Sequence, residues 1–210
     1  MVKYKPESVK SIVEKGYDRI AESYLEGRSI FDNTRYLRQF CKLLLPHSTI
    51  LDVGCGSGKP VDVYLQRRGH AVIGIDISSK QIELARRSVP QAQYVVRDMA
   101  KLQEKEYRVD AIVSFYVLFH LPWETQKHLF KIFNTFLPEG GAMLVTLGRR
   151  NWEGVRDDYF GVPMYWSTKE PLENRAMIED AGFHIVCDEI DHAAGEKHHV
   201  VIARKLRAVV

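Results

Sequence analysis

Three glycines alternate with other residues in the run Leu51-Asp52-Val53-Gly54-Cys55-Gly56-Ser57-Gly58, where an aliphatic segment gives way to a more polar one. Glycine has no Cβ, so a backbone built from it can turn tightly and lie against a ligand. Nucleotide-binding loops of Rossmann-like folds occupy this position between a strand and a helix. Lys59 stands where the dinucleotide fingerprint G-x-G-x-x-G needs its third glycine, and no G-K-[ST] follows as in a Walker A loop. The run therefore predicts a nucleotide-binding turn of neither of these kinds.

Acidic residues accompany this turn. Asp52 stands just before the first glycine, near where the pyrophosphate of a dinucleotide would lie, and a carboxylate there repels phosphate and attracts a cation. Asp76 ends the next aliphatic segment, about 20 residues on, which is the spacing at which an acid accepts hydrogen bonds from ribose hydroxyls. Asp98 follows the third such segment, where it either accepts from an adenine amino group or caps a helix. The pattern predicts a site for a positively charged nucleoside.

A largely parallel sheet would bring these acids to one edge. Short aliphatic segments predict buried strands, and helical patterns fill the gaps between them. The predicted strands are Thr49 to Val53, Ala71 to Ile75, Gln93 to Val96, Ala111 to Tyr116 and Ala142 to Leu147, and the predicted helices are Val61 to Arg68, Lys80 to Ser88 and Glu124 to Phe136. Alternation of this length predicts right-handed crossovers and hence an α/β fold.

The chain after the fifth strand is less regular. Residues 148–169 are rich in aromatic side chains and poor in periodicity, and we expect an inserted loop. A helix is expected to start near Ser167, which has capping-box spacing to Glu170, and to end at Gly182. Two further strands, Phe183 to Ile190 and His199 to Ala203, are joined by a short connection that predicts an antiparallel hairpin at one sheet edge.

Residues 1–45 precede the first strand and are expected to form a helical cap, with the main domain spanning residues 46–210. One helical face carries the apolar residues Tyr17, Ile20, Ala21 and Tyr24. This face either packs against the sheet edge or forms a lid over a ligand.

Five motifs together resemble the class I S-adenosylmethionine-dependent methyltransferases. They are Ile50 to Gly58, Val72 to Asp76, Asp98-Met99, Asp110 to Ser114 and Leu137-Pro138-Glu139-Gly140-Gly141. The resemblance covers about residues 45 to 205 and is closest to the small-molecule branch related to ubiquinone and menaquinone biosynthesis methyltransferases. It implies a Rossmann-like sheet of seven strands, with helices on both faces, and S-adenosylmethionine as cofactor with S-adenosylhomocysteine as product.

The resemblance also implies which residues contact the cofactor. The pattern Tyr17-Asp18-x-Ile20-Ala21-x-x-Tyr24 is similar to the N-terminal helix of that branch, in which the second tyrosine lies beside the cofactor. The expected cofactor residues are Tyr24, Asp52, Gly54, Cys55, Gly56, Gly58, Asp76, Ile77, Asp98, Met99 and Ser114.

Methyl transfer from a sulfonium is an in-line displacement with a neutral leaving group, so positioning does most of the catalysis. A base matters only when the acceptor is a hydroxyl or a protonated amine. His120 follows the fourth strand, where the acceptor should meet the methyl group, and is the candidate base. The alternative is a histidine that hydrogen-bonds the backbone at the entry to the next helix.

Aromatic side chains could wall a mostly apolar acceptor pocket, or could simply pack the insertion onto the domain. The expected pocket residues are Tyr116, Phe119, Trp152, Tyr159, Tyr165 and Trp166. Arg149, Arg150 and Arg156 lie nearby and either bind an acidic substrate or are solvated.

Composition narrows the function further. Lys and Arg number 30 against 27 Asp and Glu, a near balance that argues against a dedicated nucleic-acid binder. No apolar run is long enough to span a membrane and no secretory signal is visible, so a cytoplasmic location is expected. Cys41, Cys55 and Cys187 form no C-x-x-C pair and predict reduced thiols.

A metal site is not expected at the last hairpin, although His192, His198 and His199 flank it. His198 and His199 are adjacent in a predicted strand and so point to opposite faces. The leading hypothesis is a monomeric or homodimeric enzyme that methylates a small molecule. The alternatives are an RNA-modifying methyltransferase and a non-catalytic protein that binds S-adenosylmethionine.

Overall fold

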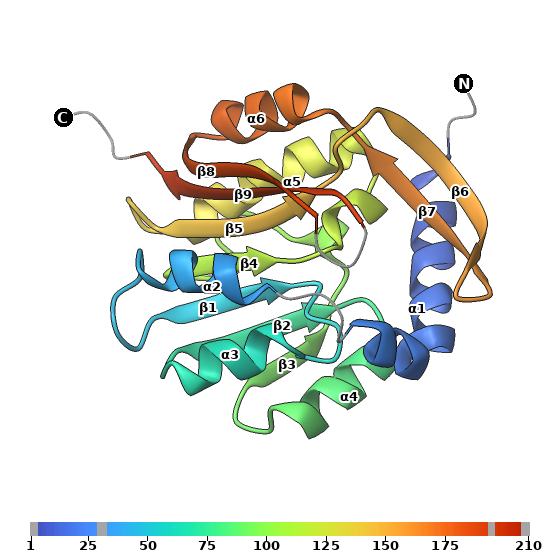
Figure 1. The fold of residues 1–210 in the computed structure, drawn as a ribbon, viewed down its shortest axis with the longest axis horizontal. Coiled ribbons are helices and arrows are strands. Elements are labelled where there is room, and N and C mark those ends of the chain that lie inside the picture. The colour runs from blue at the N-terminus through green and yellow to red at the C-terminus, as the bar shows by residue number, and fades with distance from the viewer. Residues whose placement is uncertain (1–3, 29–32, 193–195, 207–210) are drawn as a thin grey trace.

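A computed structural model describes residues 4–28, 33–192 and 196–206. Seven strands form its main sheet: β1 (Thr49–Val53), β2 (Ala71–Asp76), β3 (Gln93–Val96), β4 (Ala111–Ser114), β5 (Ala142–Leu147), β8 (Phe183–Asp191) and β9 (His198–Lys205). Their order is β3-β2-β1-β4-β5-β9-β8 (Figure 1). The first five are parallel, whereas β9 runs antiparallel to both β5 and β8. The predicted sheet with its antiparallel C-terminal hairpin is confirmed.

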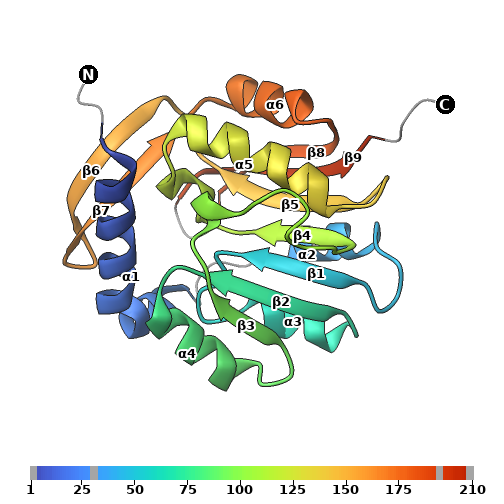
Figure 2. The ribbon, with the colours of Figure 1, turned by 180° about the vertical axis from the view of Figure 1, so that it is seen from behind.

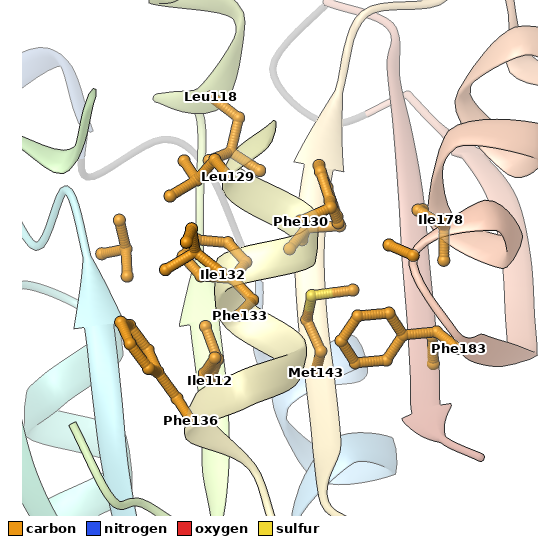
Figure 3. Packing of buried hydrophobic residues seen from close by; sticks show 14 of the residues in the cluster. Ile112, Leu118, Leu129, Phe130, Ile132, Phe133, Phe136, Met143, Ile178 and Phe183 are labelled. Atoms are coloured by element: carbon orange, nitrogen blue, oxygen red, sulfur yellow. The ribbon is translucent and has the colours of Figure 1, made fainter. Parts of the chain in front are cut away.

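Helices cover both faces of this sheet. On one face lie α2 (Thr34–Cys41) and α3 (Val61–Arg67), which pack on strand residues such as Ile50 and Val72, and α4 (Ser79–Ser88), which packs on Tyr94 of β3. Figure 2 shows the opposite face, where α5 (Trp123–Phe136) and α6 (Pro171–Asp180) lie. The phenylalanines of α5 pack on Ile112 and Met143 in the larger core cluster (Figure 3). The two faces of β2 follow the alternation of a strand, with Val72 on one side and Ile73 on the other.

The prediction of a loop for residues 148–169 is wrong, because the segment forms a separate two-stranded antiparallel sheet of β6 (Trp152–Tyr159) and β7 (Val162–Thr168). Phe160 and Gly161 connect the strands with φ of 53° and 80°, as a two-residue hairpin turn with positive φ at both positions requires. Most of β6 faces solvent, and its register shifts between Arg156 and Tyr159, so the sequence lacks a clean period of two.

The predicted start of the following helix is also displaced. Ser167 belongs to β7, and the capping box is made by Glu170 and Glu173, with Pro171 in the first turn of α6. Strand β4 ends at Ser114 rather than Tyr116, because Tyr116 has φ of +60° and the chain leaves the sheet there. A short 3₁₀ helix, η2 (Leu118–His120), follows.

Helix α1 (Pro6–Arg28) runs beside the carboxyl ends of the parallel strands, next to the β6–β7 hairpin (Figure 1). Its residues Val9, Val13 and Ile20 form an apolar cluster with Val162 and Met164 of β7. The helix therefore packs on the hairpin and at the same time covers the sheet edge at which the predicted acids lie. Among the described residues, no helix is long and apolar enough to cross a membrane.

Candidate cofactor and acceptor site

The glycine loop leaves β1 with the backbone geometry that its spacing predicts. Gly54, Gly56 and Gly58 have φ of 74°, 53° and 72°, a region that residues with a Cβ rarely adopt. The N–H groups of Gly54 and Cys55 both donate to the carbonyl oxygen of Ile75 in β2, at 2.8 and 3.0 Å. A Cβ at Gly54 would lie 2.5 Å from the Val117 side chain, so this position has no room for a larger residue.

Asp76 lies at the end of β2, directly across from this loop. Its Oδ2 accepts from the Gly56 N–H at 3.0 Å, and its Oδ1 accepts from the Ser78 N–H at 2.8 Å. Burial raises the pKa of Asp76 to about 6, although these two backbone donors favour the ionised form. Each carboxylate oxygen has two acceptor sites, so Asp76 can accept further hydrogen bonds from a ligand.

The cofactor cavity, of about 280 Å³, opens between the loop, α1 and the segment after β3. The predicted cofactor residues that line it are Tyr24, Gly54, Gly56, Asp76, Ile77, Asp98 and Met99. Asp98 lines the cavity, and its Oδ1 accepts from the Ala100 N–H and so caps the short helix η1 (Met99–Lys101). Helix α1 contributes Val9, Val13 and Tyr17 to the opposite wall.

Gln81 is a lining residue that the sequence did not indicate. It comes from the first turn of α4, it is 1% exposed, and neither its Oε1 nor its Nε2 has a hydrogen-bond partner among the described residues. A buried amide without partners costs free energy unless a ligand or water satisfies it. Only its place in the structure identifies it, since a glutamine in an amphipathic helix is otherwise unremarkable in sequence.

Four other predicted cofactor residues lie behind the loop and do not line the cavity. They are Asp52, Cys55, Gly58 and Ser114. Ser114 Oγ donates to the Val53 carbonyl at 2.8 Å and so joins β4 to β1. Cys55 is a free, buried thiol, and burial raises its pKa well above the usual value. These residues support the loop from beneath.

Asp52 belongs to a buried polar group with Asp62 and Tyr94. The Tyr94 hydroxyl donates to Asp62 Oδ2 at 2.8 Å, and a Cβ at Gly58 would lie 2.7 Å from that hydroxyl. Burial raises the pKa of Asp62, which a hydrogen bond to the Asp52 side chain partly offsets. The side chain of Asp52 therefore joins this buried group and does not line the cavity, in contrast to the expected place beside a cationic ligand.

His120 is 1% exposed and is engaged at both ring nitrogens. Nδ1 lies 2.6 Å from the carbonyl oxygen of Tyr165, so Nδ1 carries the proton and donates. Nε2 lies 2.8 Å from the Tyr17 hydroxyl, which therefore donates to it. Burial lowers the pKa of His120 to about 4, so the ring is neutral at pH 7. His120 therefore both hydrogen-bonds the backbone and lines the cofactor cavity.

The acceptor cavity, of about 470 Å³, adjoins the cofactor cavity. Five of the six predicted pocket residues line it, namely Tyr116, Phe119, Trp152, Tyr159 and Trp166. Tyr165 does not, because it is fully buried under Tyr4 and its hydroxyl donates to Glu153. Tyr24 and Tyr116 line both cavities and mark the place where they meet.

The adjacent histidines of β9 point to opposite faces, as predicted. His198 stacks on Phe119 in the acceptor cavity, whereas His199 is fully buried and its Nε2 lies 2.6 Å from Asp188 Oδ1. The acceptor cavity therefore contains the imidazole of His198, which was not among the predicted pocket residues.

The residues of the cofactor cavity fit a nucleoside. Asp76 supplies an acceptor for ribose hydroxyls, and Gln81 supplies an unpartnered donor and acceptor. The loop contributes bare backbone to the cavity wall at Gly54 and Gly56. The arrangement therefore suits the adenosine part of S-adenosylmethionine.

Comparison with known proteins agrees with this geometry. Residues 50–141 match a family model described as a methyltransferase domain. An uncharacterized methyltransferase of Synechocystis sp. is 33% identical over 171 residues, which cover 78% of this chain and 79% of that protein. A tRNA (carboxymethyluridine(34)-5-O)-methyltransferase of Arabidopsis thaliana is 32% identical over 160 residues, or 75% of this chain. The chain spans between 36% and 58% of the length of three curated relatives that it matches.

A solved structure shares the fold over nearly the whole chain. It is Burkholderia thailandensis 1,6-didemethyltoxoflavin-N1-methyltransferase with bound 1,6-didemethyltoxoflavin and S-adenosylhomocysteine, with a TM-score of 0.78 at 16% identity, covering 99% of this chain and 93% of that one. The Synechocystis relative, aligned over most of both proteins, shows the family. The chain belongs to the class I S-adenosylmethionine-dependent methyltransferases.

Proposed function

We propose that this chain transfers the methyl group of S-adenosylmethionine to a small molecule bound in the acceptor cavity. The observation that carries the proposal is that the two cavities meet at Tyr24 and Tyr116. A volume of about 470 Å³ lies in the range of small-molecule sites, and aromatic walls are typical of such sites. The Burkholderia methyltransferase, whose structure contains bound 1,6-didemethyltoxoflavin, supports this class of substrate.

The chain's own residues would hold the two reactants in line. Asp76, Gln81 and the glycine loop would bind the adenosine part of the cofactor, and Tyr24 and Tyr116 would border the reacting groups. When bound, the cofactor supplies an electrophilic methyl group and a neutral leaving group. Helix α1 covers the cavity and restricts water. Alignment of reactants in a closed site accounts for most of the catalysis of such a displacement.

His120 is the candidate base for an acceptor that must lose a proton. The Tyr17 hydroxyl would be the group through which that proton reaches Nε2, because Nε2 already accepts from it. A pKa of about 4 keeps the imidazole free to accept at neutral pH but makes it a weak base. We therefore propose that His120 contributes mainly by holding Tyr17 and α1 over the site.

The decisive experiment incubates the full chain with a methyl-deuterated donor and a metabolite extract that has been filtered to small molecules. We expect a deuterium-labelled small molecule by mass spectrometry and release of S-adenosylhomocysteine. Asp76→Asn should abolish both signals, and Trp166→Ala should reduce labelling while calorimetry still detects binding of S-adenosylhomocysteine. Binding of the cofactor without any labelled product would favour a non-catalytic binding protein.

A second candidate is methylation of tRNA, which is favoured by the Arabidopsis relative and by a second tRNA (carboxymethyluridine(34)-5-O)-methyltransferase, from Saccharomyces cerevisiae. This chain covers 36% and 58% of those proteins. The same assay with total tRNA in place of the small-molecule extract separates the two candidates. Labelled nucleosides after digestion of the tRNA, with no labelled metabolite, would support the second candidate and contradict the first.

A further inference from the structure

We propose that the acceptor is an anionic aromatic small molecule, whose negative group binds the arginines of the acceptor cavity. This inference rests on the proposed function, because it names the chemical class of the acceptor. Among the residues that the structure describes, the cavity is lined by Arg149, Arg150, Arg156 and Lys197, against one carboxylate, that of Glu196. The chain as a whole has nearly equal numbers of basic and acidic residues, so the excess of positive charge in this cavity is local.

The three arginines are available to a ligand. None of them forms an ion pair with a carboxylate in the described part of the chain, whereas the cavity's one acid, Glu196, lies 3.4 Å from Nε2 of His198. A guanidinium presents its donors in a planar fork that matches carboxylate, phosphate and sulfonate groups. A cluster of such forks without acidic partners therefore predicts an anionic ligand.

Arg156 also lies against the aromatic wall. Its guanidinium carbon is 5.2 Å from the ring centroid of Trp152 and 5.6 Å from that of Trp166. Cation–π contact with both indoles holds the charge beside the surface on which a planar ring would stack. The same wall can therefore bind the ring of the acceptor while Arg156 binds its charged substituent.

The segment that carries the other two arginines is fixed to its surroundings. The Thr168 hydroxyl donates to the carbonyl oxygen of Arg150 at 2.8 Å, and the Asn174 amide donates to that of Gly148 at 2.7 Å. This turn between β5 and β6 is therefore held on two sides. Its backbone holds both arginines at the cavity, so a ligand that binds them orders their side chains but not the backbone.

A matched pair of dyes tests the inference: 1-anilinonaphthalene-8-sulfonate and its neutral analogue N-phenyl-1-naphthylamine, titrated by fluorescence into protein saturated with S-adenosylhomocysteine. We expect the sulfonate to bind at least about tenfold more tightly. Arg156→Gln and the double variant Arg149→Gln/Arg150→Gln should each remove most of this preference. Arg87→Gln, on an exposed part of α4 outside the cavity, should leave it unchanged. Trp166→Ala should weaken both dyes alike.

Equal affinity for the two dyes, or a preference that survives the arginine variants, would overturn the inference. Calorimetry with S-adenosylhomocysteine on the same preparations tests the proposed function separately. Absence of binding in that measurement would contradict the cofactor site but would not contradict the preference for an anion. In a third arm, total tRNA is titrated at increasing salt. Tighter binding to tRNA that depends on the arginines and falls steeply with salt would assign them to nucleic acid and overturn the small-molecule inference.

Discussion

The hydroxyl group of Tyr17 lies 2.8 Å from Nε2 of His120, in a contact that joins helix α1 to the segment after β4 across the cofactor cavity. The neighbouring residue Asp18 makes a second contact of this kind, because its Oδ1 accepts from the Ser78 hydroxyl at 2.6 Å at the start of α4. Two successive residues thus hold the same helix to both sides of the cavity. A hydrogen bond of this type contributes about 1 kcal/mol, so loss of either should loosen the cover.

The stability of the protein should depend on pH through His120. The folded state holds this ring neutral down to a pKa of about 4, whereas the unfolded chain binds a proton near 6.5. Between these values the unfolded state binds more protons, so the free energy of unfolding rises with pH across that interval. The contribution is fully present above about pH 6.5 and is lost as the pH falls toward 4, with a size of up to about 3 kcal/mol.

Urea unfolding of the wild type and of His120→Gln at a series of pH values measures this contribution. The variant keeps a polar side chain at the position but cannot be protonated, so the difference in unfolding free energy between the two proteins should grow with pH. A difference that stays constant from pH 4 to pH 7 would show that His120 does not change its pKa on folding.

Asp76→Asn should abolish cofactor binding and change the stability of the protein without ligand only slightly, because removal of the buried charge is opposed by the new Nδ2 group, which must face one of the two backbone N–H donors that the carboxylate accepts from. The buried carboxylate has a pKa of about 6, so at pH 7 the fold bears the cost of keeping it ionised, on the order of 3 kcal/mol. The affinity of the wild type for S-adenosylhomocysteine should also fall as the pH is lowered through 6, because the protonated acid is a poorer acceptor for ribose hydroxyls. Calorimetry and thermal unfolding check the two effects independently.

Asp62→Asn is the matched control for Asp76. It also removes a buried carboxylate whose pKa burial raises, but it lies behind the glycine loop and outside the cavity. We expect the control to raise the melting temperature while cofactor affinity stays within about threefold of the wild type. Loss of binding in both variants would mean that Asp76 acts through the loop rather than through the ligand.

The sheet and the glycine loop were predictable because each follows from local rules. Buried parallel strands appear as aliphatic runs, and the alternating glycines predict positive φ at Gly54, Gly56 and Gly58. The β6–β7 hairpin was not predictable in this way, since its alternation is broken by a register shift and much of β6 faces solvent. Its stability comes instead from packing on α1, a contact between distant parts of the chain.

The positions of the site residues along the chain were predictable, but the directions of their side chains were not. Asp52 and Asp76 both end strands, yet only Asp76 lines the cavity, because the side chain of Asp52 joins the buried group around Asp62. Tyr165 and Trp166 are adjacent in β7 and so face opposite ways, which places only Trp166 in the acceptor cavity. In such an aromatic strand, a difference of one position therefore decides whether a side chain lines the cavity or is buried in the core.

Gln81→Leu should weaken cofactor binding without destabilising the fold. The leucine removes two buried polar atoms that have no hydrogen-bond partner among the described residues, so the melting temperature should stay the same or rise. If the amide binds the adenosine part of the cofactor, affinity for S-adenosylhomocysteine should fall about fivefold to tenfold. Gln66→Leu, in α3 and outside the cavity, is the control. Unchanged affinity in Gln81→Leu would exclude the proposed contact.

Gly54→Ala and Gly56→Ala should differ sharply in cost, although both place a Cβ in the same loop. Both positions have positive φ, so each alanine costs about 1 to 2 kcal/mol for its backbone conformation. At Gly56 the new Cβ would lie 3.6 Å from its nearest neighbour, the Gln81 side chain, which is an ordinary contact. At Gly54 it would lie 2.5 Å from two carbons of Val117, so the backbone or Val117 must move, at a further cost of about 1 to 3 kcal/mol. Urea unfolding of the two variants compares their unfolding free energies directly. Equal destabilisation would show that the Val117 side chain can move at no cost and that the loop does not need the close contact between Gly54 and Val117.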